Sequence, residues 1–173
     1  MAANSRHRLL EAARGYLMLD MPNHALRELR AVNPANGEAF AIHSLRGEAH
    51  RQKKNHIDSL AEFQIADQCS PDDLAVLFGM AWCLKRLDRL TDAIAVMERA
   101  YRVAPEEPVT LYNLACYFAL AKEKDSALAW LGRALRMDAD LRKLIPDETD
   151  FDSLRHDEHF RFIVAAVDSE SPI

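Results

Sequence analysis

One pattern of small and bulky residues recurs along this chain with a fixed period of 34 residues, without insertion or deletion. Three of its columns hold, in order, a small residue, a bulky apolar residue and a second small or short residue. These columns are Ala25, Ser59, Ala93 and Ala127; Leu29, Phe63, Met97 and Leu131; and Val32, Ala66, Ala100 and Ala134. A constant period of this length predicts a stacked array of similar helical or mixed units rather than a globule built around one active-site cleft.

Residues 74–107 are the clearest copy and predict two antiparallel helices joined by a short turn. The first helix has apolar residues at i, i+3, i+4 and i+7, the stripe of an amphipathic helix. These residues are Leu77, Met80, Ala81 and Leu84. The phase then shifts near Asp88, which is available as an N-cap, and a second stripe starts at Ala93. Pro105 and Pro108 close the copy, because proline does not continue a helix but is tolerated in its first turn.

A further column of small residues explains how the two helices of one pair pack. Its members are Ala13, Gly47, Ala81 and Ala115. Small side chains allow two helices to approach closely, and the bulky column fills the remaining space. The second copy, residues 40–73, is the least regular, because His43, Arg46 and His50 replace apolar residues. We expect this pair to be the softest part of the array, or a part that contacts a partner.

Taken together, these columns resemble the tetratricopeptide repeat (TPR) family over about residues 6 to 141. The small position of the family motif matches the column Ala13, Gly47, Ala81 and Ala115. Tyr16 and Phe118 match its aromatic position, where His50 and Leu84 depart from it. Pro71 and Pro105 match its closing proline, which Gly37 and Ala139 replace elsewhere. The resemblance rests on many columns that agree at constant spacing, since no single position is specific.

We therefore predict an all-α, right-handed α-solenoid of four TPR helix-turn-helix repeats and a C-terminal capping helix, forming one domain over residues 1–168. The repeats are residues 6–39, 40–73, 74–107 and 108–141, followed by a capping segment at 142–168 and a tail at 169–173. Phe151 to Phe160 resembles the ending that follows the last repeat in many bacterial family members. A solenoid needs such an element, because its last repeat exposes an apolar face.

Composition argues against several classes of partner. The formal net charge of −5 provides no overall attraction to phosphate backbones or anionic lipids, so neither nucleic acid nor a membrane is predicted as a partner. No apolar stretch reaches the roughly 18 residues of a membrane span. Arg6, Arg8 and Glu11 interrupt what would be the core of a secretory signal. Three cysteines without a C-x-x-C pair favour reduced thiols and a cytoplasmic location.

Residues that could support catalysis or metal binding are scattered. Neither a glycine-rich phosphate loop nor a base near Cys116 is evident, so we predict a protein that is not an enzyme and has no cofactor. His156 and His159 have a spacing that could ligate zinc on a helix, and His43 and His50 lie two turns apart on one helix. A metal-binding or hydrolytic role of the histidines stays a minor alternative to capping and polar surface roles.

The resemblance implies that the first helix of each pair lines a concave groove. In that register Phe78, Trp82 and Tyr112 are predicted to form an aromatic cluster that anchors a peptide or a partner helix. The register places further predicted groove residues beside them: Arg14, Arg51 and Lys85, which would engage acids of the ligand, and Leu10 and Leu17. The alternative is that the aromatic residues pack against neighbouring helices as core.

The predicted function is a non-catalytic protein-protein interaction module or scaffold that binds a peptide or partner segment in this groove. A small TPR chaperone for a secreted or assembly client protein is the alternative. A homo-oligomer is compatible with the sequence but is not predicted. The identity of the partner is not encoded in any motif of the chain.

Overall fold

A computed structural model describes residues 2–33 and 38–166, and all regular elements within these ranges are helices. Contacts divide the chain into two compact units, Met1–Arg89 and Leu90–Ile173. Each unit is described by itself below. The expected single domain and the right-handed path of the whole array stay predictions, and the tail at 169–173 lies outside the described residues.

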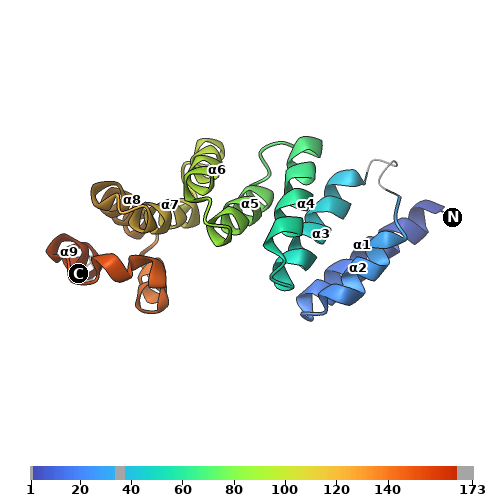
Figure 1. Cartoon of the computed structure of the whole chain (residues 1–173), viewed down its shortest axis with the longest axis horizontal. Helices are drawn as coiled ribbons and strands as arrows, with labels where there is room; N and C mark the ends of the chain where they lie inside the picture. The colour runs from blue at the N-terminus through green and yellow to red at the C-terminus, as the bar shows by residue number, and fades with distance from the viewer. Residues whose placement is uncertain (1, 34–37, 167–173) are drawn as a thin grey trace, which may run out of the picture. The chain divides into compact units, whose positions relative to one another are not determined.

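The first unit contains two complete helical hairpins and one further helix (Figure 1). Its helices are α1 (Ala2–Met18), α2 (Pro22–Arg30), α3 (Ala39–Gln52), α4 (His56–Cys69) and α5 (Leu74–Arg86). Within this unit α1 packs along α2, α3 along α4, and α5 against α4 and α3. The predicted helix-turn-helix pairing is confirmed here.

The second unit begins with the partner helix of the third repeat and continues with the fourth. Its elements are α6 (Leu90–Val103), α7 (Pro108–Leu120), α8 (Lys124–Met137), the 3₁₀ helices η2 (Ala139–Asp147) and η3 (Thr149–Leu154), and α9 (Glu158–Ala166). Helix α7 packs along α8 and against α6. None of the described helices in either unit combines the length and hydrophobicity needed to span a lipid bilayer.

Local sequence sets where several helices begin. The side chain of Asn55 accepts a hydrogen bond from the backbone N–H of Asp58 at 3.4 Å, which caps α4. Asp73 caps α5 in the same way, accepting from the N–H of Val76 at 3.0 Å. Such caps satisfy backbone donors that have no partner within the helix. Pro108 occupies the first turn of α7, where its missing N–H costs nothing.

The 34-residue period is also a backbone period, because each hairpin turn repeats one geometry. The left-handed residues of these turns are Asp20, Lys54, Asp88 and Lys122, with φ of 54°, 57°, 57° and 62°. After each of them, the next N–H donates to a carbonyl five residues back, as from Asn55 to His50 at 2.9 Å. This is the Schellman ending of a helix. Asp88 is therefore the left-handed residue that ends α5, and the prediction that it is an N-cap is wrong.

Small residues bring the helices of the first unit together, as predicted. Ala13 and Ala81 are fully buried, and Gly47 is buried against Phe63 of α4. The Phe63 ring also lies against Gly79 of α5, so one aromatic side chain fills space next to two glycines. The irregular second repeat has partners for its polar residues. His43 Nδ1 lies 2.6 Å from a Glu62 carboxylate oxygen, and the Arg46 guanidinium donates to the Leu29 carbonyl at 3.0 Å.

The capping segment differs in detail from the predicted helix. Two 3₁₀ helices, η2 and η3, precede α9, and Pro146 near the end of η2 has no N–H to donate to an α-helical ladder. Element η3 packs on α7, and α9 packs on α8. Phe151 is fully buried, and the Arg155 guanidinium donates to the carbonyls of Ile145, Pro146 and Glu148. These hydrogen bonds hold the irregular backbone of the cap in one shape.

Candidate functional site

The predicted groove residues of the first unit centre on Trp82 of α5. Helix α5 is apolar on most of its surface, and its deeply buried residues face the core, so Phe78 and Trp82 remain half-buried one turn apart. Aromatic residues that keep part of their surface exposed are typical anchors of protein interfaces.

Trp82 lies within a group of cationic and aromatic side chains. The guanidinium carbons of Arg51 and Arg86 are 5.4 Å and 5.1 Å from the centroid of its ring. The His56 ring meets it edge-on, with centroids 5.1 Å apart and an interplanar angle of 75°. Guanidinium groups at this distance from an indole ring are stabilised by a cation–π interaction. We call Arg51, His56, Trp82 and Arg86 the Trp82 cluster.

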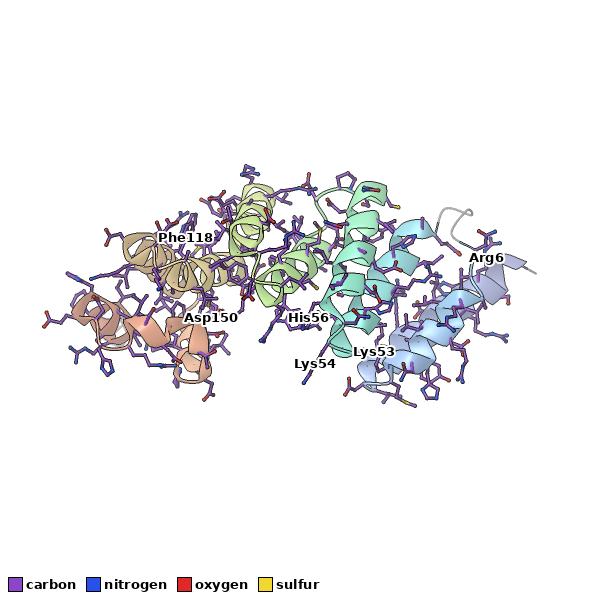
Figure 2. The ribbon with its side chains drawn as sticks, in the orientation of Figure 1. Arg6, Lys53, Lys54, His56, Phe118 and Asp150 are labelled. Atoms are coloured by element: carbon purple, nitrogen blue, oxygen red, sulfur yellow. The ribbon has the colours of Figure 1, made fainter. Side chains whose placement is uncertain are left out.

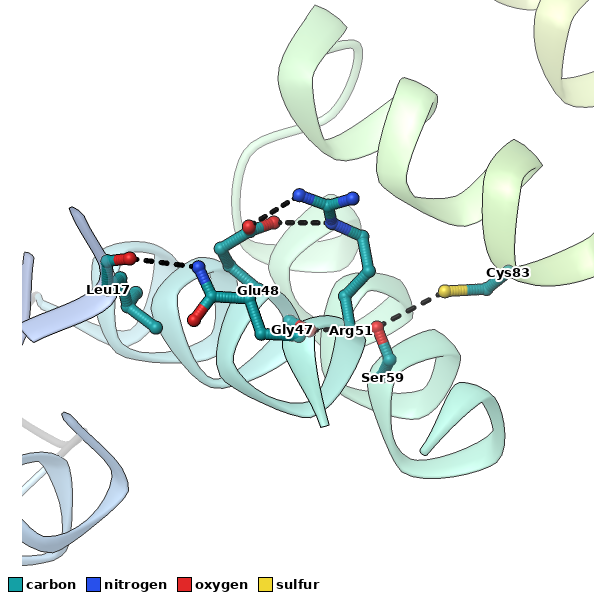
Figure 3. A network of polar contacts seen from close by, with 7 residues as sticks. Leu17, Gly47, Glu48, Arg51, Ser59 and Cys83 are labelled. Atoms are coloured by element: carbon teal, nitrogen blue, oxygen red, sulfur yellow. Dashed lines mark hydrogen bonds and ion pairs between the residues drawn. The ribbon is translucent and has the colours of Figure 1, made fainter. Parts of the chain in front are cut away.

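Arg51 already has a partner within its own helix. Its guanidinium donates two hydrogen bonds to the carboxylate of Glu48, at 2.7 Å and 2.6 Å (Figure 3). The hydrogen bond to Glu48 is the main reason that the pKa of Arg51 is raised above its usual value. The prediction that Arg51 engages acids of a ligand stays a prediction; in the structure its guanidinium pairs with Glu48 and lies over the Trp82 ring.

The other predicted cations take different positions. Arg14 is exposed on α1 and pairs with Glu11 one turn earlier at 2.5 Å. Lys85 is half-buried near the end of α5.

Sequence reasoning did not single out three exposed cations in or near the Trp82 cluster. Arg86, Lys53 and Lys54 are exposed, and within the described residues none of them forms an ion pair. Lys53 and Lys54 lie in the turn from α3 to α4, two or three residues before His56 of the Trp82 cluster (Figure 2). Arg86 follows Trp82 by four residues, and this one-turn spacing was the signal available in the sequence.

Three predicted groove residues are part of the core instead. Leu10 and Leu17 keep 6% and 8% of their surface exposed, because both pack in the apolar cluster beneath α1. Tyr112 of α7 is 4% exposed and meets Phe151 of the cap edge-on, with ring centroids 5.7 Å apart. Burial raises the pKa of the Tyr112 hydroxyl well above its usual value. The predicted clustering of Tyr112 with Phe78 and Trp82 involves both units and stays a prediction.

A buried chain of polar contacts supports the helices that carry the Trp82 cluster (Figure 3). The Ser59 hydroxyl of α4 donates to the Gly47 carbonyl of α3 at 2.8 Å and accepts from the Cys83 thiol of α5 at 3.1 Å. Burial raises the pKa of that thiol, which keeps Cys83 protonated and able to donate. The Gln52 amide also donates to the Leu17 carbonyl at 2.9 Å, which ties α3 to the end of α1.

The histidines do not assemble a metal site within the described residues. The group of potential ligands found there is Cys116, Glu148 and Asp150, whose ligand atoms lie within 4.8 Å of one another. Glu148 also accepts from the N–H of Asp150 at 3.2 Å, which caps η3. His159 is exposed and lies 3.8 Å from an Asp157 oxygen. The metal-binding or hydrolytic role of the histidines stays a minor alternative.

The second unit carries an aromatic and arginine cluster that the sequence analysis did not identify. The Arg133 guanidinium donates to the Tyr101 hydroxyl at 2.6 Å and lies 4.6 Å from the Trp130 ring centroid. The rings of Tyr101 and Trp130 meet edge-on at 4.9 Å. All three side chains are half-buried, and they link α6 to α8.

A shallow depression of about 390 Å³ lies elsewhere in the second unit, between α6 and the turn from α7 to α8. It is lined by Leu90, Thr91, Ile94, Phe118, Ala121 and Glu123. None of the predicted site residues lines this depression.

Solved structures with the same fold support the helical-repeat architecture. MamA from Desulfovibrio magneticus RS-1 is similar with a TM-score of 0.74 and 14% identity, over 97% of this chain and 98% of its own. YrrB, a TPR protein with an unusual peptide-binding site, has a TM-score of 0.73 and 11% identity, over 94% and 86%. A TPR protein from Parabacteroides merdae ATCC 43184 has a TM-score of 0.70 and 16% identity, over 96% and 68%.

Comparison of sequences identifies the repeat itself. No curated protein matches this chain significantly. A family model described as a tetratricopeptide repeat matches residues 76–141, which include all of α6, α7 and α8. The matched residues have the predicted 34-residue period, and the helical hairpins follow it throughout the described chain. Residues 76–141 therefore match the tetratricopeptide repeat family, and the whole chain shares the fold of solved tetratricopeptide repeat proteins.

Proposed function

We propose that this protein is a non-catalytic interaction module that binds a peptide or a partner segment on the first unit, at Phe78 and the Trp82 cluster. The observation that carries the proposal is the half-buried Trp82 ring bordered by the guanidinium groups of Arg51 and Arg86, at 5.4 Å and 5.1 Å. Tryptophan and arginine are the residues most enriched among the energetic hot spots of interfaces.

The support beneath this site favours binding without a large rearrangement. Helices α3, α4 and α5 are joined by the contacts of Ser59 with Gly47 and Cys83. The pair of Glu48 and Arg51 fixes one side of the Trp82 ring. A site whose side chains are already held loses less conformational entropy when a ligand binds.

Likeness to YrrB is consistent with the proposal, since that protein is described as a TPR protein with an unusual peptide-binding site. The likeness at 11% identity concerns the fold, and the residues of the site proposed here come from this chain alone. Of the predicted groove residues, Phe78, Trp82 and Arg51 belong to the proposed site. Lys85 and Arg14 are proposed as flanking contacts.

The test uses photo-cross-linking in cells of the native organism, with a photoreactive amino acid at position 85 beside Trp82. Cross-linked peptides identified by mass spectrometry define the partner segment. We expect Trp82→Ala to reduce the cross-linked product at least fivefold, and Trp130→Ala, the matched tryptophan change in the second unit, to leave it unchanged. Equal products from the parent protein and from Trp82→Ala, with helical circular dichroism preserved, would overturn the proposal.

The identity of the cross-linked protein also addresses the chaperone alternative. A single secreted or assembly client would favour a dedicated chaperone, whereas several unrelated partners would favour a scaffold. The cytoplasmic location of the protein stays a prediction, and cell fractionation tests it.

A further inference from the structure

We infer that the segment recognised by the Trp82 cluster is an acidic peptide, and that Arg86 receives its carboxylates, assisted by Lys53 and Lys54. This inference rests on the proposed function and adds the chemistry of the partner. It also changes the roles assigned from sequence, because Arg51 positions the aromatic ring and Arg86 binds the ligand.

The arginines on either side of Trp82 differ in whether an acid already pairs with them. Arg51 is neutralised by two hydrogen bonds to Glu48 at 2.7 Å and 2.6 Å. Arg86 is exposed, lies 5.1 Å from the Trp82 ring centroid, and has no ion pair within the described structure. Its planar guanidinium therefore keeps its donors available, and such a group binds carboxylates through two parallel hydrogen bonds.

Two lysines lie close in sequence to His56 of the Trp82 cluster. His56 touches the Trp82 ring at the beginning of α4, and the turn before it carries Lys53 and Lys54, both exposed and without an ion pair in the described residues. Figure 2 shows Lys53, Lys54 and His56 along one edge of this unit. Asp58, the acid nearest to them in sequence, accepts a hydrogen bond from the Asn55 amide at 2.6 Å.

The charge of the region around Trp82 differs from that of the whole chain. The protein has a formal net charge of −5, whereas this region has four cations, Arg51, Lys53, Lys54 and Arg86, against three acids, Glu48, Asp58 and Asp88. A cationic patch on an acidic protein attracts a short anionic segment at close range, while the remaining surface repels long polyanions. This balance favours an acidic peptide over a nucleic acid.

The experiment uses fluorescence anisotropy of the full chain with three labelled probe peptides: eight glutamates, eight glutamines and eight lysines. We expect the glutamate peptide to bind at least tenfold more tightly than the other two, and added salt to weaken it. In a Trp130→Phe background, binding should change the emission of Trp82, the tryptophan that remains.

Matched variants separate a specific site from general charge. We expect Arg86→Gln to reduce affinity for the glutamate peptide at least fivefold and Arg86→Lys to reduce it less. Arg136→Gln, which removes an exposed arginine of α8 in the second unit, should have no effect. Similar losses from Arg86→Gln and Arg136→Gln, or equal affinity for the glutamate and glutamine peptides, would overturn the inference.

A fourth probe, a labelled oligothymidylate of eight nucleotides, tests the competing class of anion. Tighter binding of this probe than of the glutamate peptide, with the same dependence on Arg86, would assign the site to nucleic acid and overturn the acidic-peptide inference. Failure of the acidic-peptide inference can be distinguished from failure of the proposed function. If Trp82→Ala removes cross-linking while the glutamate peptide does not bind, the interaction site stands and its partner is not acidic.

Discussion

Phe63 of α4 lies so close to Gly79 of α5 that a Cβ atom added to Gly79 would come within 2.5 Å of the ring. The ring is also held by Gly47 on its other side, where an added Cβ would approach to 2.7 Å. Gly79→Ala should therefore overpack this core and lower the free energy of unfolding by about 1–3 kcal/mol. Urea denaturation followed by circular dichroism measures the change.

Gly15 of α1 provides the control, since nothing lies within 4 Å of a Cβ added there. Gly15→Ala should raise stability by about 0.5–1 kcal/mol, because alanine is the better helix former. Equal effects of the two substitutions would contradict the close packing of Phe63 against Gly79.

Lys54 has a left-handed backbone with φ of 57°, a conformation that costs energy for a residue with a Cβ. Lys54→Gly should therefore stabilise the turn by up to about 1 kcal/mol, visible as a higher melting temperature. Lys53→Gly is the matched change, because Lys53 has φ of −75° and gains nothing from glycine. A lower melting temperature for Lys54→Gly than for the parent protein would refute the strain argument.

Arg155 joins the backbone of the cap through hydrogen bonds to the carbonyls of Ile145, Pro146 and Glu148, at 3.4, 3.1 and 3.0 Å. Arg155→Ala removes these three hydrogen bonds and should cost about 1–3 kcal/mol, although the Ile145 and Glu148 carbonyls still accept from the N–H groups of Glu148 and Phe151. Hydrogen exchange of amides in η2 and η3 should accelerate more than exchange in α4. The control is Arg161→Ala on the exposed side of α9, for which we expect no change.

Tyr112 links stability to high pH. Burial raises the pKa of its hydroxyl in the folded state above the usual value of about 10 that it keeps when unfolded. The part of the free energy of unfolding that depends on a neutral Tyr112 is therefore fully present below about pH 10. It is lost as pH rises towards the folded-state pKa, because the unfolded state releases the proton first.

The matched variant for this pH effect is Tyr112→Phe, which keeps the ring contact with Phe151 and removes the hydroxyl, a group without a hydrogen-bond partner among the described residues. Urea denaturation at pH 8 and pH 11 should show a smaller loss of stability for Tyr112→Phe than for the parent protein. Identical losses would indicate that Tyr112 does not titrate in this range.

Much of the fold was predictable because the repeat has one physical cause at every copy. Helices α5 and α7 begin at Leu74 and Pro108, at the predicted repeat boundaries. Small and bulky columns report local packing between neighbouring helices, and that packing is the same wherever the columns recur. The cap was predicted in place but not in form, since Pro146 and the carbonyl contacts of Arg155 act on irregular backbone.

The site was predictable only in part, because the position of a residue in the repeat does not show whether a neighbouring element covers its side chain. Tyr112 occupies a groove position in sequence, yet Phe151 of the cap covers it. Trp82 lies on the face of α5 that corresponds to the Tyr112 face of α7, and its side chain stays half-buried. Arg51 and Arg86 are both arginines near this ring, and only the three-dimensional pairing of Arg51 with Glu48 distinguishes their roles.

The hairpin turns of this protein keep the same backbone conformation with different side chains. Asp20, Lys54, Asp88 and Lys122 share one left-handed conformation and are all exposed, although they alternate between an acid and a base. Evolution can therefore reverse a charge at any of these corners while the helices beneath keep their packing. Lys54 stands at one such corner, two residues before His56 of the Trp82 cluster, so a reversed charge there would alter the surface next to the proposed site and leave the helix packing unchanged.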